Sequence, residues 1–183
     1  MGSERELVER AQAGDTGAFD VLVSFYAKRV LSIAWGIVRS ASDAEELAQE
    51  AFVKAYQSIG RFRLDEPFGP WIFRITTNLA LDVLKHRKRV KHEEITEREP
   101  APRRDRADLP AITNEIARRI GGAIDELPEM QRVVAQLHLI EEFEHREIAA
   151  MTGLSEGTVR SHLSLARGKL REKLADLYGD GDD

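Results

Sequence analysis

Residues 144–171 read EHREIAAMTGLSEGTVRSHLSLARGKLR, and they decide the fold of the C-terminal part of the chain. Ile148 and Met151 stand one helical turn apart, and the alanines between them are small enough to let a second helix approach closely. Gly153 supplies the positive φ that ends a helix, and Ser155 is a favourable N-cap for the next one. The order of these signals predicts a short helix, a tight turn and a second helix.

The second of these helices, expected over 156–177, has one apolar side and one basic side. Its apolar residues recur at helical spacing and form one stripe, namely Val159, Leu163, Ala166, Leu170 and Leu174. The other side carries cations and hydroxyl groups, at Arg160, Ser161, Ser164, Arg167 and Arg171. Arginine can fork onto a guanine edge or hold a phosphate, and serine can donate to either. The stretch therefore predicts a helix-turn-helix for the DNA major groove, with an ordinary helical hairpin as the alternative.

Composition excludes several classes of protein. The chain has 183 residues, of which 42% are hydrophobic, so it can form one or two small cores. It has no cysteine, which excludes disulfides and thiolate metal sites and fits a reducing cytoplasm. Polar residues interrupt apolar runs such as 133–140, and the first residues, MGSERE, contain no hydrophobic signal core. We therefore expect a cytoplasmic protein without direct membrane insertion.

Residues 93–111 are almost all charged or proline, which predicts a flexible linker between two helical domains. No run alternates with period two, so we expect no sheet and an all-α fold. The helices that periodicity predicts cover about 4–13, 16–38, 43–58, 71–89, 113–126, 129–140, 145–152 and 156–177. The expected parts are a helical bundle over 1–92, the flexible linker, a helix-turn-helix domain over 112–178 and a disordered acidic tail over 179–183.

The predicted helix over 43–58 has an acidic outer face. It opens with Ser42 as the expected N-cap and Glu45 three residues later, a capping-box pattern. Its buried side would hold Leu47, Ala48, Ala51, Phe52 and Ala55. The outward residues are mainly acidic and amide side chains, at Asp43, Glu46, Gln49 and Glu50. Such a face is either ordinary solubilising charge or a docking surface for a basic protein partner.

The next segment combines aromatic and basic residues. Residues 61–70, RFRLDEPFGP, predict a loop that displays Phe62 and Phe68. The helix that follows would project Trp71, Arg74, Asn78, Lys85 and Arg89 on roughly one side. Although the net charge of the chain is −5, this stretch is basic, and rings, an amide and cations together suit single-stranded DNA. The alternative is that Trp71 and both phenylalanines are core residues.

Four segments, in this order, resemble the extracytoplasmic-function (group 4) bacterial sigma factors. They are DAEELAQE at 43–50, WIFRITTNLALDVLK at 71–85, LPEMQR at 127–132 and EIAAMTGLSEGTVRS at 147–161. The resemblance covers nearly the whole chain. It implies that the first domain is the family's region 2 and the second its region 4. It also implies a protein that is not an enzyme and has no cofactor or metal of its own, because the polymerase supplies the catalytic metal.

The resemblance assigns a partner to each surface. The clamp coiled coil of the largest subunit of core RNA polymerase would bind at Asp43, Glu46, Leu47, Gln49 and Glu50. The single-stranded minus-10 element would bind at Phe62, Arg63, Trp71, Arg74, Asn78, Lys85 and Arg89. The duplex minus-35 element would bind at Ser155, Thr158, Arg160, Ser161, Ser164, Arg167 and Arg171. The resemblance further implies an anti-sigma factor, often anchored in the membrane, that keeps the protein silent.

Two positions depart from the family pattern. Relatives commonly carry arginine where this chain has His162 and Leu165. The loss of two cations would remove phosphate contacts, weaken minus-35 binding and flatten its salt dependence. Leu165 could instead touch a thymine methyl group or a protein. Glu46 replaces a frequent aspartate, which is a mild change.

Two other classes of function are compatible with parts of the sequence. A stand-alone helix-turn-helix repressor would bind a palindromic duplex as a dimer, but it has no need of the aromatic and basic groups of the first domain. A metal-dependent hydrolase could use His138 and His145, which are seven residues apart with Glu141 or Glu142 between them. That spacing matches no established zinc helix signature.

Overall fold

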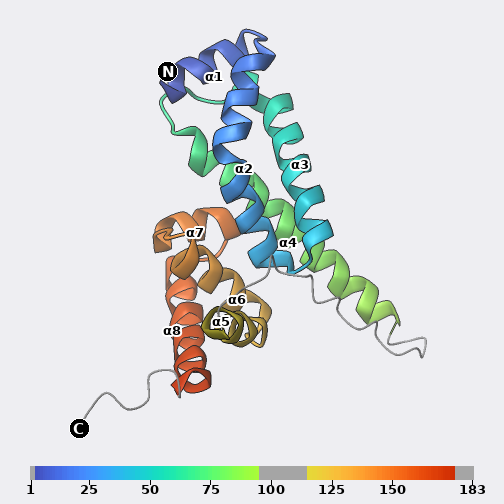
Figure 1. Cartoon of the computed structure of the whole chain (residues 1–183), viewed down its shortest axis with the longest axis vertical. Helices are drawn as coiled ribbons and strands as arrows, with labels where there is room; N and C mark the ends of the chain where they lie inside the picture. Colours follow the sequence, from blue (N-terminus) through green and yellow to red (C-terminus); the bar gives the residue numbers. More distant parts are fainter. Residues whose placement is uncertain (1–2, 95–114, 176–183) are drawn as a thin grey trace. The chain divides into compact units, whose positions relative to one another are not determined.

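The computed structural model describes residues 3–94 and 115–175, and all regular secondary structure in these ranges is helical. The expectation of an all-α fold is confirmed. The chain divides into two compact units, Met1–Arg106 and Ala107–Asp183 (Figure 1). Most of the predicted linker and the whole predicted acidic tail lie outside the described residues.

The first unit is a bundle built around α2 (Thr16–Val38), whose bounds match the predicted helix. Helices α1 (Glu4–Gln12), α3 (Ala41–Ser58) and α4 (Phe68–Glu94) pack against it, with a 3₁₀ turn, η1 (Ile59–Arg61), after α3. By length and apolar composition α2 could cross a membrane, but Leu22, Val30, Ile33 and Ile37 are each at most 1% exposed. We therefore interpret α2 as the core helix of this unit.

Two helix starts in the first unit differ from the prediction. The N-cap of α3 is Ser40, not Ser42, because the Ser40 hydroxyl accepts the backbone N–H of Asp43. Helix α4 begins at Phe68 rather than near Trp71 and continues through Glu94, two residues into the predicted linker. Its start is crowded, since a Cβ at Gly69 would lie 3.1 Å from the Tyr26 ring. Glycine is the residue that permits this close approach.

The second unit contains the predicted helix-turn-helix. It comprises α5 (Glu115–Asp125), α6 (Glu129–Ala135), a π-helical turn η2 (Gln136–Ile140), α7 (His145–Thr152) and α8 (Glu156–Lys173). The single helix expected over 129–140 is thus an α-helix that widens into a π turn. Gly153 ends α7 with a φ of 73°, and the Ser155 hydroxyl accepts the Thr158 N–H at 3.1 Å. Both cap predictions are confirmed.

The apolar stripe of α8 holds this unit together. Val159, Leu163, Ala166 and Leu174 are buried, and Leu170 is partly buried against the core cluster around Leu127. The opposite side of the helix is open to solvent. At its end, Lys173 forms an ion pair with Glu126 just after α5. The stripe predicted from the sequence is therefore the packing surface, and it fixes which side of α8 faces outward.

Candidate nucleic-acid and protein interfaces

The acidic face of α3 is smaller than the sequence suggested. Glu46, Gln49 and Glu50 are exposed, and Glu50 forms a surface ion pair of 2.9 Å with Lys54. Val53 continues the same helical side and is 54% exposed. These residues form one stripe with acidic, amide and apolar groups.

Two residues predicted to contact a protein partner with this stripe are placed differently. Leu47 is 3% exposed and packs into the core, because it lies on the apolar side of the helix. Its burial does not agree with a direct contact, and we correct its role to holding α3 in place. The carboxylate of Asp43 is bound by Arg87 of α4, which also donates to the Val38 carbonyl oxygen at 2.8 Å. Asp43 therefore joins α3 to α4 within the unit.

The loop phenylalanines are core residues, and the expectation that they are displayed is wrong. Phe62 and Phe68 are 8% and 0% exposed. The Trp71 ring packs on both, with centroids 4.8 Å from Phe62 and 5.4 Å from Phe68, and it is itself half-exposed. Tyr26 extends the cluster beneath Phe68, with centroids 5.5 Å apart. The loop and the start of α4 thus bury two rings and leave a third, that of Trp71, half-exposed.

The cations near this ring differ in their partners. Arg74, Asn78, Lys85 and Arg89 are all exposed along α4, as predicted. Lys85 is paired with Asp82 at 3.0 Å. Among the described residues, no ion pair occupies Arg74 or Arg89. Beyond the aromatic ring, α4 therefore presents an amide and available guanidinium groups.

Arg63 in the loop already has an acidic partner. Its Nε and Nη2 donate to the two carboxylate oxygens of Asp65, at 3.1 and 2.6 Å. This pairing lowers the pKa of Asp65 and raises the pKa of Arg63, and both side chains are exposed to solvent. A phosphate bound by Arg63 would have to displace Asp65, and surface ion pairs of this kind exchange at small cost.

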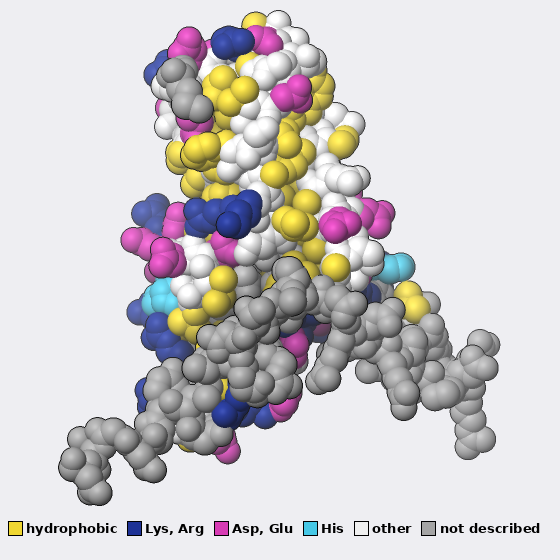
Figure 2. Space-filling view, viewed as in Figure 1, with side chains coloured by type: hydrophobic (Ala, Val, Ile, Leu, Met, Phe, Trp, Pro, Cys, Tyr) yellow, Lys and Arg dark blue, Asp and Glu magenta, His cyan; other side chains and the backbone are white. Residues whose placement is uncertain are grey.

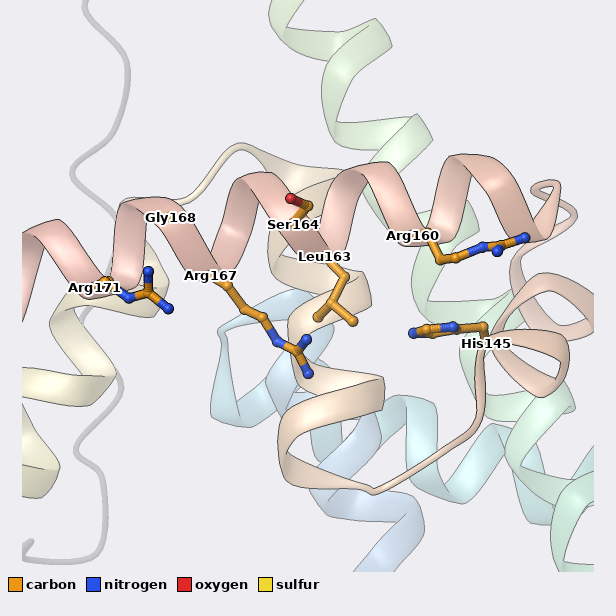
Figure 3. A pocket seen from close by; sticks show the side chains of 7 residues that line it. All are labelled: His145, Arg160, Leu163, Ser164, Arg167, Gly168 and Arg171. Atoms are coloured by element: carbon orange, nitrogen blue, oxygen red, sulfur yellow. The ribbon is translucent and has the colours of Figure 1, made fainter.

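In the second unit, α8 borders an open hollow of about 410 Å³. Its lining comprises His145, Arg160, Leu163, Ser164, Arg167, Gly168 and Arg171. Figure 3 shows His145, from the start of α7, on the same side of α8 as Arg160 and Arg167. All the predicted groove-facing side chains of α8, Arg160, Ser161, Ser164, Arg167 and Arg171, are exposed. Their guanidinium and hydroxyl groups could donate to phosphates and base edges.

Residues at the start of α8 serve the helix itself. The hydroxyl groups of Ser155 and Thr158 are hydrogen-bonded to each other at 2.8 Å, and Ser155 also caps the helix. Thr158 is half-buried. The hydroxyl groups of Ser155 and Thr158 are therefore already hydrogen-bonded within the protein before any DNA binds. The sequence did not single out His145 for this surface, although its place at the start of the helix before α8 is a usable signal.

The positions that depart from the family pattern lie on different sides of α8. Leu165 is 52% exposed, whereas His162 is half-buried with Nδ1 enclosed. His138 and His145 do come together, as rings tilted by 35° with centroids 4.9 Å apart, and Nδ1 of His138 is 2.8 Å from the Phe143 carbonyl oxygen. Within the described ranges, no group of three or more His, Cys, Asp or Glu side chains could hold a metal ion. The arrangement gives the hydrolase alternative no support.

Comparison with known proteins agrees with this division into two units. The family model for Sigma-70 region 2 matches residues 22–90, and the model for Sigma-70, region 4 matches residues 117–170. The chain is 34% identical to the RNA polymerase sigma-H factor of Pseudomonas aeruginosa over 95% of both chains. It is 33% identical to the ECF RNA polymerase sigma-E factor of Haemophilus influenzae, over 96% of this chain and 97% of that one.

A solved structure has a similar fold. CnrH, solved in complex with the cytosolic domain of CnrY, superposes with a TM-score of 0.68 at 26% identity. The match covers 96% of this chain and 99% of CnrH.

Proposed function

The chain belongs to the extracytoplasmic-function sigma factors, and from this premise we propose that it directs core RNA polymerase to promoters and melts their minus-10 element. The observation that carries the proposal is the surface at the start of α4. There the half-exposed Trp71 ring rests on Phe62 and Phe68, and Arg74 and Asn78 follow along the same helix. A fixed ring beside donors suits an unpaired base.

The free energy gained by binding unpaired bases is large enough to offset the cost of opening base pairs. Unstacking a base step costs a few kcal/mol, and stacking a base on an aromatic ring returns about 1–3 kcal/mol. Contacts from Arg74 and Asn78 to the strand would supply the remainder. Binding energy is then sufficient, and the polymerase performs the phosphoryl transfer.

The second unit would bind the minus-35 element as duplex. We assign α8 to the major groove, where Arg160, Ser164 and Arg167 can reach base edges and phosphates. The exposed Leu165 could contact a thymine methyl group. This unit positions the complex, because contacts to duplex do not require opened base pairs.

Polymerase would dock on the stripe of α3. Glu46 and Glu50 offer negative charge to a basic clamp coiled coil, and Val53 adds apolar contact area beside them. An exposed valine in line with the carboxylates favours a protein interface over purely solubilising charge. Asp43 acts from inside the unit by holding α3 to α4.

Silencing by an anti-sigma factor in the cytoplasm belongs to the same proposal. The similar chain CnrH was captured with the cytosolic domain of another protein. Figure 2 shows apolar side chains at several places on the surface of the first unit. Those exposed on α2 are Val21, Phe25 and Leu31, with Phe25 at 77%. Such groups are available to a protein partner.

The test is initiation by core polymerase on a randomised promoter pool, with and without the purified chain. RNA from a defined start site, made only when the chain is present, is the expected result, and the selected promoters report both elements. A repressor would instead bind a palindromic duplex without polymerase, which a gel shift detects. Absence of any defined start site would refute the proposal.

A further inference from the structure

Helix α1 lies outside the residues matched by the region 2 model, and the proposed function gives it no role. Yet both of its ends make hydrogen bonds to the segment between α3 and α4. Figure 1 shows this segment, in green, passing beside α1. The contacts join residues far apart in the sequence, so they are a feature of the fold and not of the local chain.

At its C-terminal end, α1 holds the beginning of the segment. Nε2 of Gln12 donates to the carbonyl oxygens of Ile59 and Phe62, each at 2.8 Å. A side-chain amide has two N–H groups, so both donors are used. Gln12 is half-buried, which limits competition from water. One side chain thereby fixes the chain at η1 and at the first ring of the aromatic cluster.

At its N-terminal end, α1 holds the end of the segment. Oε1 of Glu4 accepts the backbone N–H of Phe68 at 2.9 Å, and Oε2 accepts the Tyr26 hydroxyl. Phe68 is the first residue of α4, so Glu4 satisfies a donor that has no partner within that helix. A carboxylate is also favoured at the positive end of a helix dipole. Glu4 therefore caps α4 from a different helix.

The two attachment points determine the shape of the loop. Glu4 and Gln12 are separated by about 12 Å along α1, at the usual helical rise. The chain from Phe62 to Phe68 could extend over roughly 20 Å. The Phe62 and Phe68 rings nevertheless pack together with centroids 5.9 Å apart, so residues 63–67 loop outward, and Arg63, Asp65 and Glu66 are exposed there.

We propose that α1 is a splint for this loop, and that Glu4 and Gln12 are positioning residues for the capture of the minus-10 base. The inference rests on the proposed function, because it takes the surface around Trp71 as the capture site. A loop ordered in the free protein does not have to be ordered when DNA binds, so the splint favours capture of the correct base. Neither residue is expected to touch DNA.

The experiment uses the full chain with core polymerase on fork templates whose minus-10 region is already single-stranded. The measured quantity is the ratio of affinities for the cognate and a scrambled non-template strand. Gln12→Met keeps the side-chain volume but removes both donors, and we expect it to lower the ratio about tenfold. Glu4→Ala should do the same, whereas Glu4→Gln retains a partner for both Phe68 and Tyr26 and should restore it.

The matched control lies on the same helix. Glu6→Ala truncates an exposed side chain of α1 and should leave the ratio unchanged. Binding to a minus-35 duplex should be equal in all variants, and each is measured well below its own melting temperature. If Gln12→Met and Glu4→Ala weaken both strands equally, so that the ratio is unchanged, the splint proposal is wrong. If the wild-type chain shows no strand preference, base capture itself is refuted, and the splint with it.

Discussion

Replacing Arg74 and Asn78 by alanine together tests whether captured bases melt the promoter. Both side chains are exposed on α4, and Arg74 has no ion pair among the described residues. Exposed substitutions of this kind change stability by only about 0.5 kcal/mol. The unit should therefore fold normally, and a change in initiation can be assigned to lost contacts with DNA.

The size of the effect follows from the groups removed. A hydrogen bond to a charged group contributes about 1.5–3 kcal/mol and a neutral one about 0.5–1.5 kcal/mol. Together they amount to roughly 2–4.5 kcal/mol, or about 30- to 2,000-fold in the open complex. On a closed duplex this loss adds to the opening cost. On a template with a pre-formed bubble that cost is absent, so the weakened complex stays largely occupied.

The assay measures initial transcription from matched closed and bubble templates, with wild-type, Arg74→Ala/Asn78→Ala and control chains. Glu6→Ala, at an exposed position on α1, is the control and should behave as wild type on both. We expect the double variant to be inactive on the closed template and within about tenfold of wild type on the bubble. Equal loss on both templates would show that these residues do not act through melting.

Three further changes have defined outcomes. Glu46→Lys with Glu50→Lys reverses the charge of the docking stripe and should abolish co-purification with core polymerase at an unchanged melting temperature; retained association would disprove the docking site. The bond from Arg10 lowers the pKa of Asp15, the N-cap of α2, below 3.8, so its stabilisation is present above that value and is lost as pH falls through the lowered pKa. Asp15→Asn should therefore be less stable than wild type at pH 6 and converge with it in acid, as urea unfolding at several pH values can show. Gly153→Ala places a side chain at a φ of 73° and should cost about 1–2 kcal/mol in the second unit, visible as weaker minus-35 binding near its melting temperature.

Local signals predicted the helices and the second unit well. The bounds of α2 and α7, the αL glycine at 153 and the Ser155 cap all follow from periodicity and capping chemistry. The start of α3 was missed because Ser40 and Ser42 are each followed three residues later by an acidic residue. Local sequence offers two equivalent caps there, and packing selects one.

The features of the site that were missed depend on contacts over long separations in sequence. Phe62 and Phe68 are buried because they pack against Tyr26 and Trp71. The local sequence around a phenylalanine in a loop is the same whether its side chain is exposed or buried. The bond from Gln12 to Phe62 spans 50 residues. Hydrophobic periodicity reports only local spacing and cannot predict such a contact. The sequence therefore gave no sign that α1 has a functional role.

Several basic side chains of the first unit form ion pairs with acidic neighbours. Arg63 is held by Asp65, Lys85 by Asp82 and Arg87 by Asp43. Attraction to random DNA is almost entirely electrostatic, and the chain as a whole carries −5. The free chain should therefore bind random DNA weakly. Under the proposed function, it would bind core polymerase first and contact promoter DNA only as part of that complex.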